Sequence, residues 1–500
     1  MILACLRIAA AALTLFLICP ADTRAQEWPQ FRGPNSGGIS ATTRPLPVAF
    51  SATENVRWSA NVGDGAGGAV VAAGRLFVSG MTGADTVSLF AFDTATGKKL
   101  WQRDWPTGRL ADITPPNSHA STTPAADAER VYFYFSTLGL RAVDARSGGD
   151  LWHQKLPTPF IAFKWGPGMS PVLYRDMVLF VQDDDMYPAL QAFDKSTGRL
   201  RWKDERLDMS VNYSHPIACG PDVIVAGTGM LIGYDPDSGR RRWYAKTLLR
   251  NIKTTPVCDG GVVYVSVQSG GIANQWLASV DQVKTGNNDG KVTKAEIQAY
   301  VGDPVPETFF QRTFDRGDVN KDGVLEGREL DLAFLPADNF AGADFTAMGD
   351  KAAEEYILAV RAGGNGDVTR SHLLWKHRTK HTDHLVSPFV SGGRMFLLKG
   401  GGISTVFETS TGKPTRPPQR IGTPSSYYAS PVSGDGKIYI AGEGGVVLVL
   451  KNSPDYELLA QNDVGESIIG TPAIAGDSLF IRTRTKVLAI GAAGAAGRSH

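Results

Sequence analysis

The apolar residues of this chain fall in short alternating runs rather than in long helical stripes. Runs of about four to eight residues with this alternation predict β-strands, and the glycine- and aspartate-rich segments between them predict turns. One unit recurs between such runs and reads hydrophobic-Asp-x-x-Thr/Ser-Gly-x-x-x-Trp. Its copies are Asp93–Trp101, Asp144–Trp152, Asp194–Trp202 and Asp235–Trp243. Because a unit of fixed spacing marks one structural element used many times, the pattern predicts a repeat architecture.

A second marker gives the number of repeats. It is a small residue, or in one case a histidine, followed by proline, an apolar run and a tight turn. The markers are Thr123, Ser170, His215, Thr255, Ser387, Ser430 and Thr471, and Gly68 takes the equivalent place in the first repeat without the proline. Eight starts with about four short strands each predict an all-β, eight-bladed β-propeller.

The two ends of the chain are expected to close the ring. The eighth repeat contains only three expected strands, the last of them at Lys486–Ile490. The missing strand is expected at Glu54–Ala60, which contains Trp58 but lacks a preceding Asp turn. Pairing these strands would remove the free edges that promote aggregation.

The repeated Asp, Thr or Ser, and Gly predict a tight turn between the third and fourth strands of a blade. The carboxylate can accept backbone N–H groups within the turn, and glycine supplies the positive φ. The Trp that follows is expected on the outer strand, wedged against the neighbouring blade. These residues are predicted to be structural, and no catalytic residue is predicted.

The fifth repeat is interrupted by an acidic segment with helical periodicity. Trp243 and Trp375 lie 132 residues apart, whereas the preceding Trp residues are 51, 50 and 41 residues apart. The segment contains an EF-hand loop in which Gly323 makes the sharp turn. Its predicted ligands are Asp318, Asn320, Asp322, the carbonyl of Val324, Glu326 and Glu329. Hard oxygen donors at this spacing predict a Ca²⁺ site.

A partner loop begins 33 residues earlier. Its ligand positions are Thr285, Asn287, Asp289, Lys291, Thr293 and Glu296. Thr285 replaces the Asp expected at the first position, which removes a charge and predicts a weaker site. With or without calcium, Val292 is expected to pair with Leu325 as the short bridge between the loops. The ion is expected to be constitutive rather than a signal.

The chain is expected to divide into six segments. A short apolar run followed by Thr23-Arg-Ala25 predicts a cleaved signal peptide, and Ile18 before Cys19 does not fit a lipid-attachment site. No later stretch is long and apolar enough to span a membrane, so the mature protein is expected to be periplasmic or secreted. The expected segments are 1–25 signal peptide, 26–53 N-terminal arm, 54–277 first part of the propeller, 278–345 EF-hand pair, 346–491 second part of the propeller, and 492–500 disordered tail.

The remaining composition narrows the function classes. The net charge of +1 gives no electrostatic footprint for nucleic acid. Two cysteines, Cys219 and Cys258, remain after removal of the signal peptide, either as a disulfide or as two buried thiols. The run Asp183–Asp185 is interpreted as a solvated loop rather than a metal site. A monomer is expected.

In a propeller, the loops that lead into the innermost strands converge on one mouth of the central channel. Candidate ligand-binding residues in these loops are His119, Trp165, Tyr213, His215, Lys253, His384 and Tyr428. Aromatic and imidazole groups at such a mouth could bind a protein, a sugar or a small molecule. The sequence favours the other interpretation, in which they fill the channel and hydrogen-bond across it.

The Asp-x-x-Thr-Gly-x-x-x-Trp unit resembles the tryptophan-docking motif of the pyrroloquinoline-quinone (PQQ) repeat, or quinoprotein-like, β-propellers. The segment Trp28–Pro34 is similar to the start of many exported bacterial proteins in that group, some of which carry EF-hand insertions. The resemblance covers roughly residues 28–491 outside the insertion. It implies the propeller fold and leaves two activities open.

One branch of this group consists of dehydrogenases that hold PQQ between a Trp and a ring of two adjacent cysteines, with a Ca²⁺ and an Asp base nearby. This sequence has no adjacent Cys pair. Another branch consists of non-catalytic scaffolds that help to assemble outer-membrane barrels, usually lipid-anchored. The sequence favours an exported, calcium-binding, non-enzymatic binding or scaffold protein; the alternative is a PQQ-dependent oxidoreductase of alcohols or sugars with an atypical cofactor site.

Overall fold

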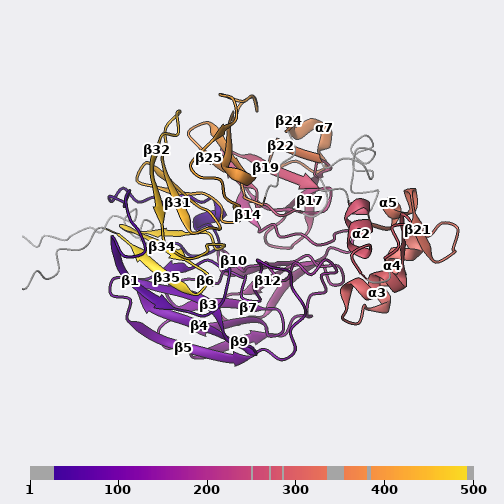
Figure 1. The fold of residues 1–500 in the computed structure, drawn as a ribbon, viewed down its shortest axis with the longest axis horizontal. Coiled ribbons are helices and arrows are strands. Elements are labelled where there is room, and N and C mark those ends of the chain that lie inside the picture. The colour runs from indigo at the N-terminus through magenta and orange to yellow at the C-terminus, as the bar shows by residue number, and fades with distance from the viewer. Residues whose placement is uncertain are drawn as a thin grey trace, which may run out of the picture.

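The computed structural model describes residues 27–248, 252–269, 272–283, 286–334, 354–379 and 385–491. Their strands form nine sheets, eight of which are arranged around a central axis as the blades of a propeller (Figure 1). This is the eight-bladed all-β fold predicted from the sequence. The expected signal peptide and the tail 492–500 lie outside the described residues.

The first four blades follow one another along the chain. Blade one contains β2 (Val70–Ala72), β3 (Arg75–Gly83), β4 (Thr86–Asp93) and β5 (Lys99–Pro106), and blade two contains β6 (Ala125–Ala126), β7 (Arg130–Phe135), β8 (Gly139–Asp144) and β9 (Asp150–Gln154). Blade three contains β10 (Val172–Tyr174), β11 (Met177–Gln182), β12 (Ala189–Asp194) and β13 (Leu200–Glu205), and blade four contains β14 (Ile217–Cys219), β15 (Asp222–Ala226), β16 (Leu231–Tyr234) and β17 (Arg241–Ala245).

The last four blades complete the ring. Blade five contains β18 (Val257–Asp259), β19 (Val262–Ser269), β22 (Glu354–Arg361) and β24 (Leu373–Arg378), and blade six contains β25 (Phe389–Ser391), β26 (Arg394–Lys399), β27 (Ile403–Glu408) and β28 (Gln419–Arg420). Blade seven contains β29 (Val432–Gly434), β30 (Lys437–Ala441), β31 (Val446–Lys451) and β32 (Leu458–Asp463), and blade eight contains β33 (Ala473–Ala475), β34 (Ser478–Arg482), β35 (Lys486–Ile490) and β1 (Val56–Asn61).

The strand that closes the ring comes from the N-terminal part of the chain, as predicted. β1 pairs antiparallel with β35, so that Trp58 lies opposite Ala489. The Nε1 group of Trp58 also donates to the carbonyl of Thr94 in blade one at 2.9 Å. Blade eight is therefore joined to its neighbour by an indole as well as closed by a strand.

The repeated Trp residues join each blade to the next one. Trp101 on β5 lies over Gly148 in the turn of blade two, where an added Cβ would come within 2.8 Å of the indole. Its Nε1 donates to the carbonyl of Ala145 at 3.2 Å. In the same turn, Asp144 accepts the backbone N–H of Ser147 at 2.8 Å, as the sequence predicts. The same docking is made by Trp58, Trp152, Trp202 and Trp375.

Trp243 departs from this arrangement, because its indole does not dock on a turn of the next blade. Its side chain is fully buried in the core that blade four shares with blade five and the insertion, and its Nε1 donates to Asp222 of its own blade at 2.8 Å. The cause is the next blade, in which Asn365 stands near β23 (Gly366–Asp367) and no Asp-x-x-Thr-Gly turn offers a docking place. β23 instead pairs parallel with β17 and covers the outer edge of blade four.

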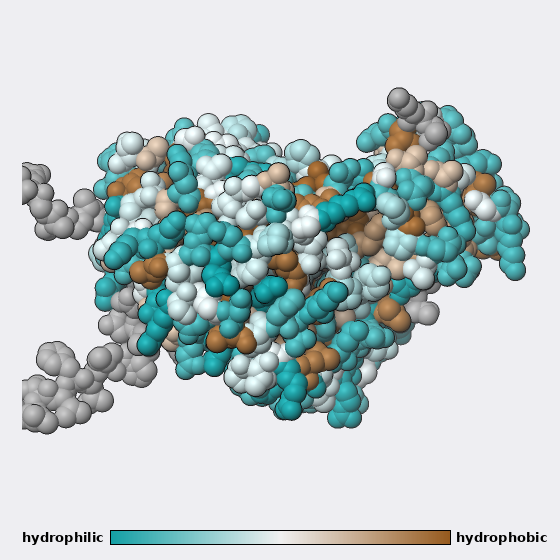
Figure 2. Space-filling view, turned by 90° about the horizontal axis from the view of Figure 1, so that it is seen from below, coloured by the Kyte–Doolittle hydropathy of each residue, from teal (hydrophilic) through white to brown (hydrophobic). Residues whose placement is uncertain are grey.

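The helical insertion leaves blade five between β19 and β22. It contains α2 (Ile272–Val280), β20 (Lys291–Thr293), α3 (Lys294–Val301), α4 (Glu307–Gly317), β21 (Val324–Glu326) and α5 (Arg328–Phe334). Figures 1 and 2 show it projecting from one edge of the ring, with hydrophilic side chains over most of its outer surface. Its buried residues belong to the same apolar cluster as those of blades four and five, so the insertion shares a core with the propeller.

A disulfide joins two innermost strands of adjacent blades. Cys219 on β14 and Cys258 on β18 are bonded, with their Cα atoms 5.6 Å apart. Of the two alternatives left open by the sequence, the structure has the disulfide.

Candidate binding site at the channel mouth

The marker residues that precede the innermost strands form a ring around the channel. Each blade contributes one, in the order Gly68, Thr123, Ser170, His215, Thr255, Ser387, Ser430 and Thr471. The backbone N–H of one marker donates to the hydroxyl of the marker in the next blade, for example from Thr123 to Ser170 at 3.1 Å and from Thr255 to Ser387 at 3.0 Å. These hydroxyls join neighbouring blades at the axis. This role was not predicted, although the repeated Ser and Thr at the marker position were its signal in the sequence.

The N-terminal arm crosses the channel at the level of the innermost strands. Trp28 is buried, and its backbone N–H donates to the carbonyl of Val71 in blade one at 2.8 Å. Arg32 is also buried and donates from Nη2 to the carbonyl of Pro388 at 2.7 Å, close to blade six. Further hydrogen bonds with other blades come from Pro29, Gln30, Asn35, Gly38 and Thr42. The arm therefore closes one side of the channel. The other side is the mouth formed by the loops, which stays open.

His215 is the one imidazole in the ring of markers. It stacks on Phe31 of the arm with ring centroids 4.3 Å apart, and its Nδ1 lies 3.0 Å from the hydroxyl oxygen of Thr255. Within the described part of the chain, its buried Nε2 has no hydrogen-bond partner. Burial, with a smaller contribution from the charge of Arg32, lowers the pKa of His215 to about 3. The imidazole is therefore neutral at physiological pH.

Two adjoining hollows occupy the channel above the arm. The deeper one, about 150 Å³, has Phe31 and the marker ring in its lining. The one at the mouth, about 310 Å³, shares Tyr213 and Lys253 with it. Lys253 places its Nζ 5.0 Å from the ring centroid of Trp165, a cation–π contact. The hydroxyl of Tyr213 donates to the carbonyl of Gly166 at 3.1 Å.

The structure brings most of the predicted mouth residues together. Trp165, Tyr213, Lys253 and Tyr428 line the hollow at the mouth, and His215 lies in the deeper one. His119 lines neither hollow; it is half-buried, and burial lowers its pKa. His384 lies outside the described residues.

Some lining residues were not predicted. Phe31 comes from the arm, far from the mouth loops in sequence, and its aromatic character within a Pro/Gly-rich segment was the available signal. Asn117, Leu385 and Ile469 also line the mouth. They carry no motif, because only the closure of the ring brings them to the axis.

The segment predicted as the second EF loop has its donor groups turned into the loop. The carboxylate of Asp318 accepts the backbone N–H groups of Asp322 at 3.1 Å and Gly323 at 2.9 Å, and Gly323 has a φ of +79°. Glu329, on α5, accepts the N–H of Val319 at 3.0 Å. Carboxylate, amide and carbonyl oxygens in this arrangement are the hard donors that Ca²⁺ takes.

The predicted first EF loop is joined to the second through the pairing of β20 and β21. Val292 lies opposite Leu325, as predicted, and Lys291 pairs with Glu326 at 2.7 Å. Thr285 lies outside the described residues. Asp281, which was not predicted, accepts the N–H of Asn288 at 3.0 Å and brings a carboxylate to this loop.

The other predicted positions of the first loop are hydrogen-bonded among themselves. The amide of Asn287 donates to Asp289 at 2.9 Å. Thr293 caps α3 in a capping box with Glu296, whose carboxylate accepts the Thr293 N–H at 2.9 Å. Across the described ranges, no three His, Cys, Asp or Glu side chains gather closely enough to mark a metal site by geometry alone.

Comparison with known proteins identifies the family. Two matches to one family model, at residues 34–164 and 161–311, together span more than half of the chain, and that family is described as outer membrane protein assembly factor BamB. The chain belongs to this family. A curated relative, the outer membrane protein assembly factor BamB of Moranella endobia (strain PCIT), is 23% identical over 257 residues, which is 46% of this chain and 62% of the relative. The chain thus spans less than two thirds of that relative's length.

Several solved structures share the fold of this protein at low sequence identity. BamB from Moraxella catarrhalis has a TM-score of 0.51 and 11% identity, over 86% of this chain and 98% of that one. A europium-containing methanol dehydrogenase has a TM-score of 0.50 and 11% identity, over 92% of this chain and 90% of that one. At this identity the likenesses establish the propeller alone. Within the described ranges, every helix is too short or too polar to cross a lipid bilayer.

The residues at the mouth do not match the site in which the dehydrogenases of the PQQ-repeat propellers hold PQQ. Trp165 offers an indole, but no cysteine and no carboxylate belongs to the described lining of either hollow. The disulfide joins Cys219 and Cys258, which are not adjacent in sequence.

The interpretation of Asp183–Asp185 as a solvated loop is wrong. Asp183 and Asp184 are fully buried, and Asp183 forms a two-pronged ion pair with Arg206, with both N···O distances at 2.8 Å. Burial raises the pKa of Asp184 to about 6, although its carboxylate accepts the N–H groups of Met186 and Tyr187. The sequence run reads as polar, but Arg206 lies opposite it only in the folded chain.

Proposed function

We propose that this chain is an exported, calcium-binding propeller that binds a protein partner at the open mouth of its channel and catalyses no reaction. The observation that carries the proposal is the hollow at the mouth, which is lined by Trp165, Tyr213 and Tyr428 together with Lys253. Aromatic rings with one cation provide apolar contact area and an orienting charge, which are the features of a binding hot spot. The description of the family as an assembly factor supports a protein as the partner.

The closed side of the channel supports binding at the mouth. The arm fills the opposite side, with Trp28 and Arg32 each almost fully buried. A partner can therefore approach the axis from the loop side alone.

The EF-hand pair supports the calcium part of the proposal. Asp318, Asn320, Asp322 and Glu329 would hold the ion in the second loop, together with the carbonyl of Val324. In the first loop, the ligands would be Asn287, Asp289, the carbonyl of Lys291, Thr293 and Glu296. The carboxylate of Asp281 would supply the negative charge that is missing at Thr285. The ion would tie each loop to the helix that follows it. Export, inferred from the N-terminal segment, would expose both loops to plentiful calcium.

Calorimetry tests calcium binding. Chelator-treated protein is titrated with Ca²⁺, and we expect heat from a tighter and a weaker site. Asp318→Ala should remove the tighter site, while Asp303→Ala, in the same insertion but outside both loops, should leave both. No heat in the wild-type protein, or unchanged binding in Asp318→Ala, would contradict calcium binding.

Photo-cross-linking in cells tests binding at the mouth. A photoreactive phenylalanine analogue replaces Tyr428 in the mouth, and in a control strain it replaces Leu151, which is 47% exposed on the outer strand β9. We expect one defined protein cross-linked from position 428 and not from 151, with the yield reduced by Lys253→Ala. Equal products from both positions, or none from 428, would contradict the proposal.

Addition of PQQ tests the oxidoreductase alternative. The purified protein is incubated with PQQ and Ca²⁺, and we expect neither a bound-quinone absorbance nor dye-linked oxidation of alcohols or sugars. Stoichiometric PQQ with turnover would overturn the non-enzymatic assignment.

A further inference from the structure

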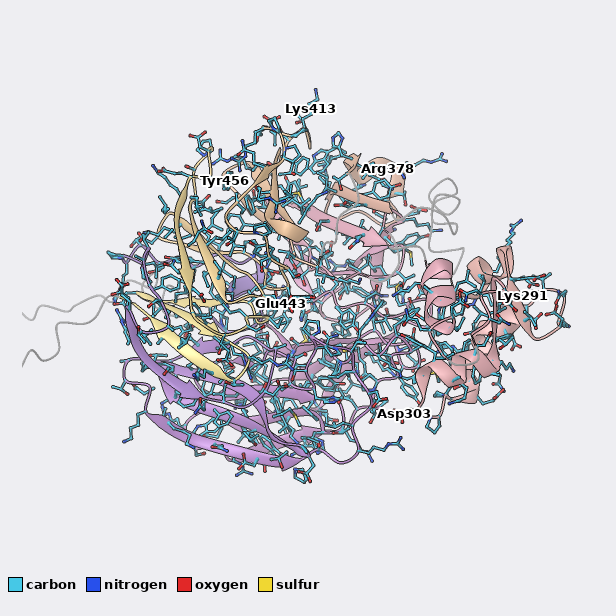
Figure 3. The ribbon with its side chains drawn as sticks, in the orientation of Figure 1. Lys291, Asp303, Arg378, Lys413, Glu443 and Tyr456 are labelled. Atoms are coloured by element: carbon cyan, nitrogen blue, oxygen red, sulfur yellow. A yellow bond between two sulfur atoms is a disulfide. The ribbon has the colours of Figure 1, made fainter. Side chains whose placement is uncertain are left out.

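The helical insertion packs against loops that belong to other blades. The insertion interrupts blade five. Phe309 of α4 nevertheless contacts Phe160, in the connection between blades two and three, with ring centroids 5.4 Å apart. Arg312 of α4 donates to the carbonyl of Met186 in blade three at 3.2 Å. Figure 3 shows Asp303 on the side of the insertion that faces the blades and Lys291 on its outer side. The insertion thus bridges separate parts of the ring.

Trp276 of α2 lies at the centre of the insertion. Its indole, 1% exposed, stacks on Phe334 of α5 with centroids 4.9 Å apart. It also approaches Tyr300 of α3 at 6.4 Å and Phe309 of α4 at 6.3 Å. The helices α3, α4 and α5 therefore each place an aromatic ring against Trp276.

The residues that close the two EF loops lie on these same helices. Glu296 and Tyr300 are one helical turn apart on α3, and Glu329 and Phe334 both belong to α5. Because a helix moves as a rigid unit, a displacement of either glutamate toward an ion in its loop also displaces the ring that packs against Trp276.

One aromatic side chain connects Trp276 to the mouth. Phe163 is buried between the two, with its ring centroid 4.6 Å from Trp276 and 5.1 Å from Trp165. Trp165 in turn lies below the ammonium of Lys253 and lines the hollow at the mouth. The path from the EF loops to the mouth is therefore a continuous series of packed rings.

We propose that calcium in the EF-hand pair sets the position of Trp165 through Phe163, and so forms the partner-binding mouth. This inference rests on the proposed function, which supplies both the ion and the site. Loss of the ion would loosen α3 and α5, release Trp276 and widen or collapse the hollow beside Lys253. A coupling between two sites of one domain changes affinity by about 5- to 150-fold, and we expect an effect in this range at the mouth.

Fluorine NMR of the full chain tests this coupling. The protein is labelled with 5-fluorotryptophan, and the resonances of Trp165, Trp276 and Trp101 are assigned by single Trp→Phe replacements. When Ca²⁺ is added to chelator-treated protein, we expect Trp276 and Trp165 to shift and Trp101, in the outer strand of blade one, to stay. Glu329→Gln should reduce both shifts.

The variant Phe163→Leu separates the two halves of the inference. It should keep calcium binding by calorimetry and the shift of Trp276, and lose the shift of Trp165. If calcium binds to the wild-type protein and Trp165 does not shift, the coupling is wrong while the proposed function stands. If no calcium binds, the calcium part of the proposed function fails and the coupling fails with it. The wild-type measurement decides the matter even if Phe163→Leu does not fold.

Discussion

Replacement of His215 should change how the stability of this propeller depends on pH. The imidazole is buried between Phe31 and Thr255, and its pKa is lowered to about 3. In the unfolded chain a histidine titrates near pH ~6.5. Between these two pKa values the unfolded state binds a proton and the folded state does not. The contribution of neutral His215 to the free energy of unfolding is therefore fully present above pH ~6.5 and is lost as the pH falls toward 3.

The size of the effect follows from the two pKa values. Each unit of difference corresponds to about 1.4 kcal/mol, so a fall from about 6.5 to about 3 amounts to roughly 5 kcal/mol when both states have titrated. Between pH ~7.5 and ~4 only part of this range is covered, and the loss from His215 alone is about 3 kcal/mol. No discount for solvent applies, because the side chain is buried.

Urea denaturation at a series of pH values measures this effect. The free energy of unfolding is compared between the wild-type protein and His215→Gln, so that the titrations of other groups cancel in the difference. We expect the variant to be less stable near pH ~7.5, since it loses the stacking on Phe31, and to gain about 3 kcal/mol relative to the wild type by pH ~4. His215→Leu should give the same slope with a different offset, and parallel profiles for wild type and both variants would refute the reasoning.

Three further predictions concern stability and are checked by the same urea titrations. Asp184→Asn should remove a loss of up to about 3 kcal/mol that the wild type shows as pH rises from about 4 to 7, because burial makes the folded state hold this proton more tightly; an unchanged slope would contradict it. Gly97→Ala should cost about 2–4 kcal/mol, since its φ is +69° and the new Cβ would lie 2.5 Å from an indole of the adjacent blade, whereas Gly108→Ala, with φ +66° and open space, should cost only about 1 kcal/mol. Removal of the disulfide by Cys219→Ser with Cys258→Ser should cost about 4 kcal/mol, because the two residues are 39 apart in sequence; a difference below about 1 kcal/mol would show that the closed loop contributes little.

The repeat architecture could be predicted because its cause is local. The turn around Asp93, Thr96 and Gly97 is made by residues within a few positions of one another, so the same letters give the same geometry in each blade. The alternation of apolar residues gave the strands, and the missing fourth strand of blade eight pointed to Trp58. The second EF loop could be predicted for the same reason, since one short segment contains all of its donor residues.

Other features depended on contacts that no local pattern contains. Trp243 has the same motif as Trp101, but the blade that follows it lacks the turn on which it would dock, so the indole turns inward to Asp222. Asp183 reads as a surface residue until Arg206 is placed against it. In both cases the environment of the side chain is set by residues distant in sequence: the turn of the next blade for Trp243, and Arg206 at the end of the same blade for Asp183.

The sequence by itself determined the number of blades, the closure of the ring and the place of the insertion, because short-range turn and strand chemistry repeats with a fixed period. Tertiary structure alone decided the channel: which mouth the arm closes, that His215 meets Phe31, and that Phe163 meets Trp276 of the insertion. The physical reason is that these contacts join segments more than a hundred residues apart or different blades, and only the packing of the closed ring and the insertion against it brings their side chains within reach.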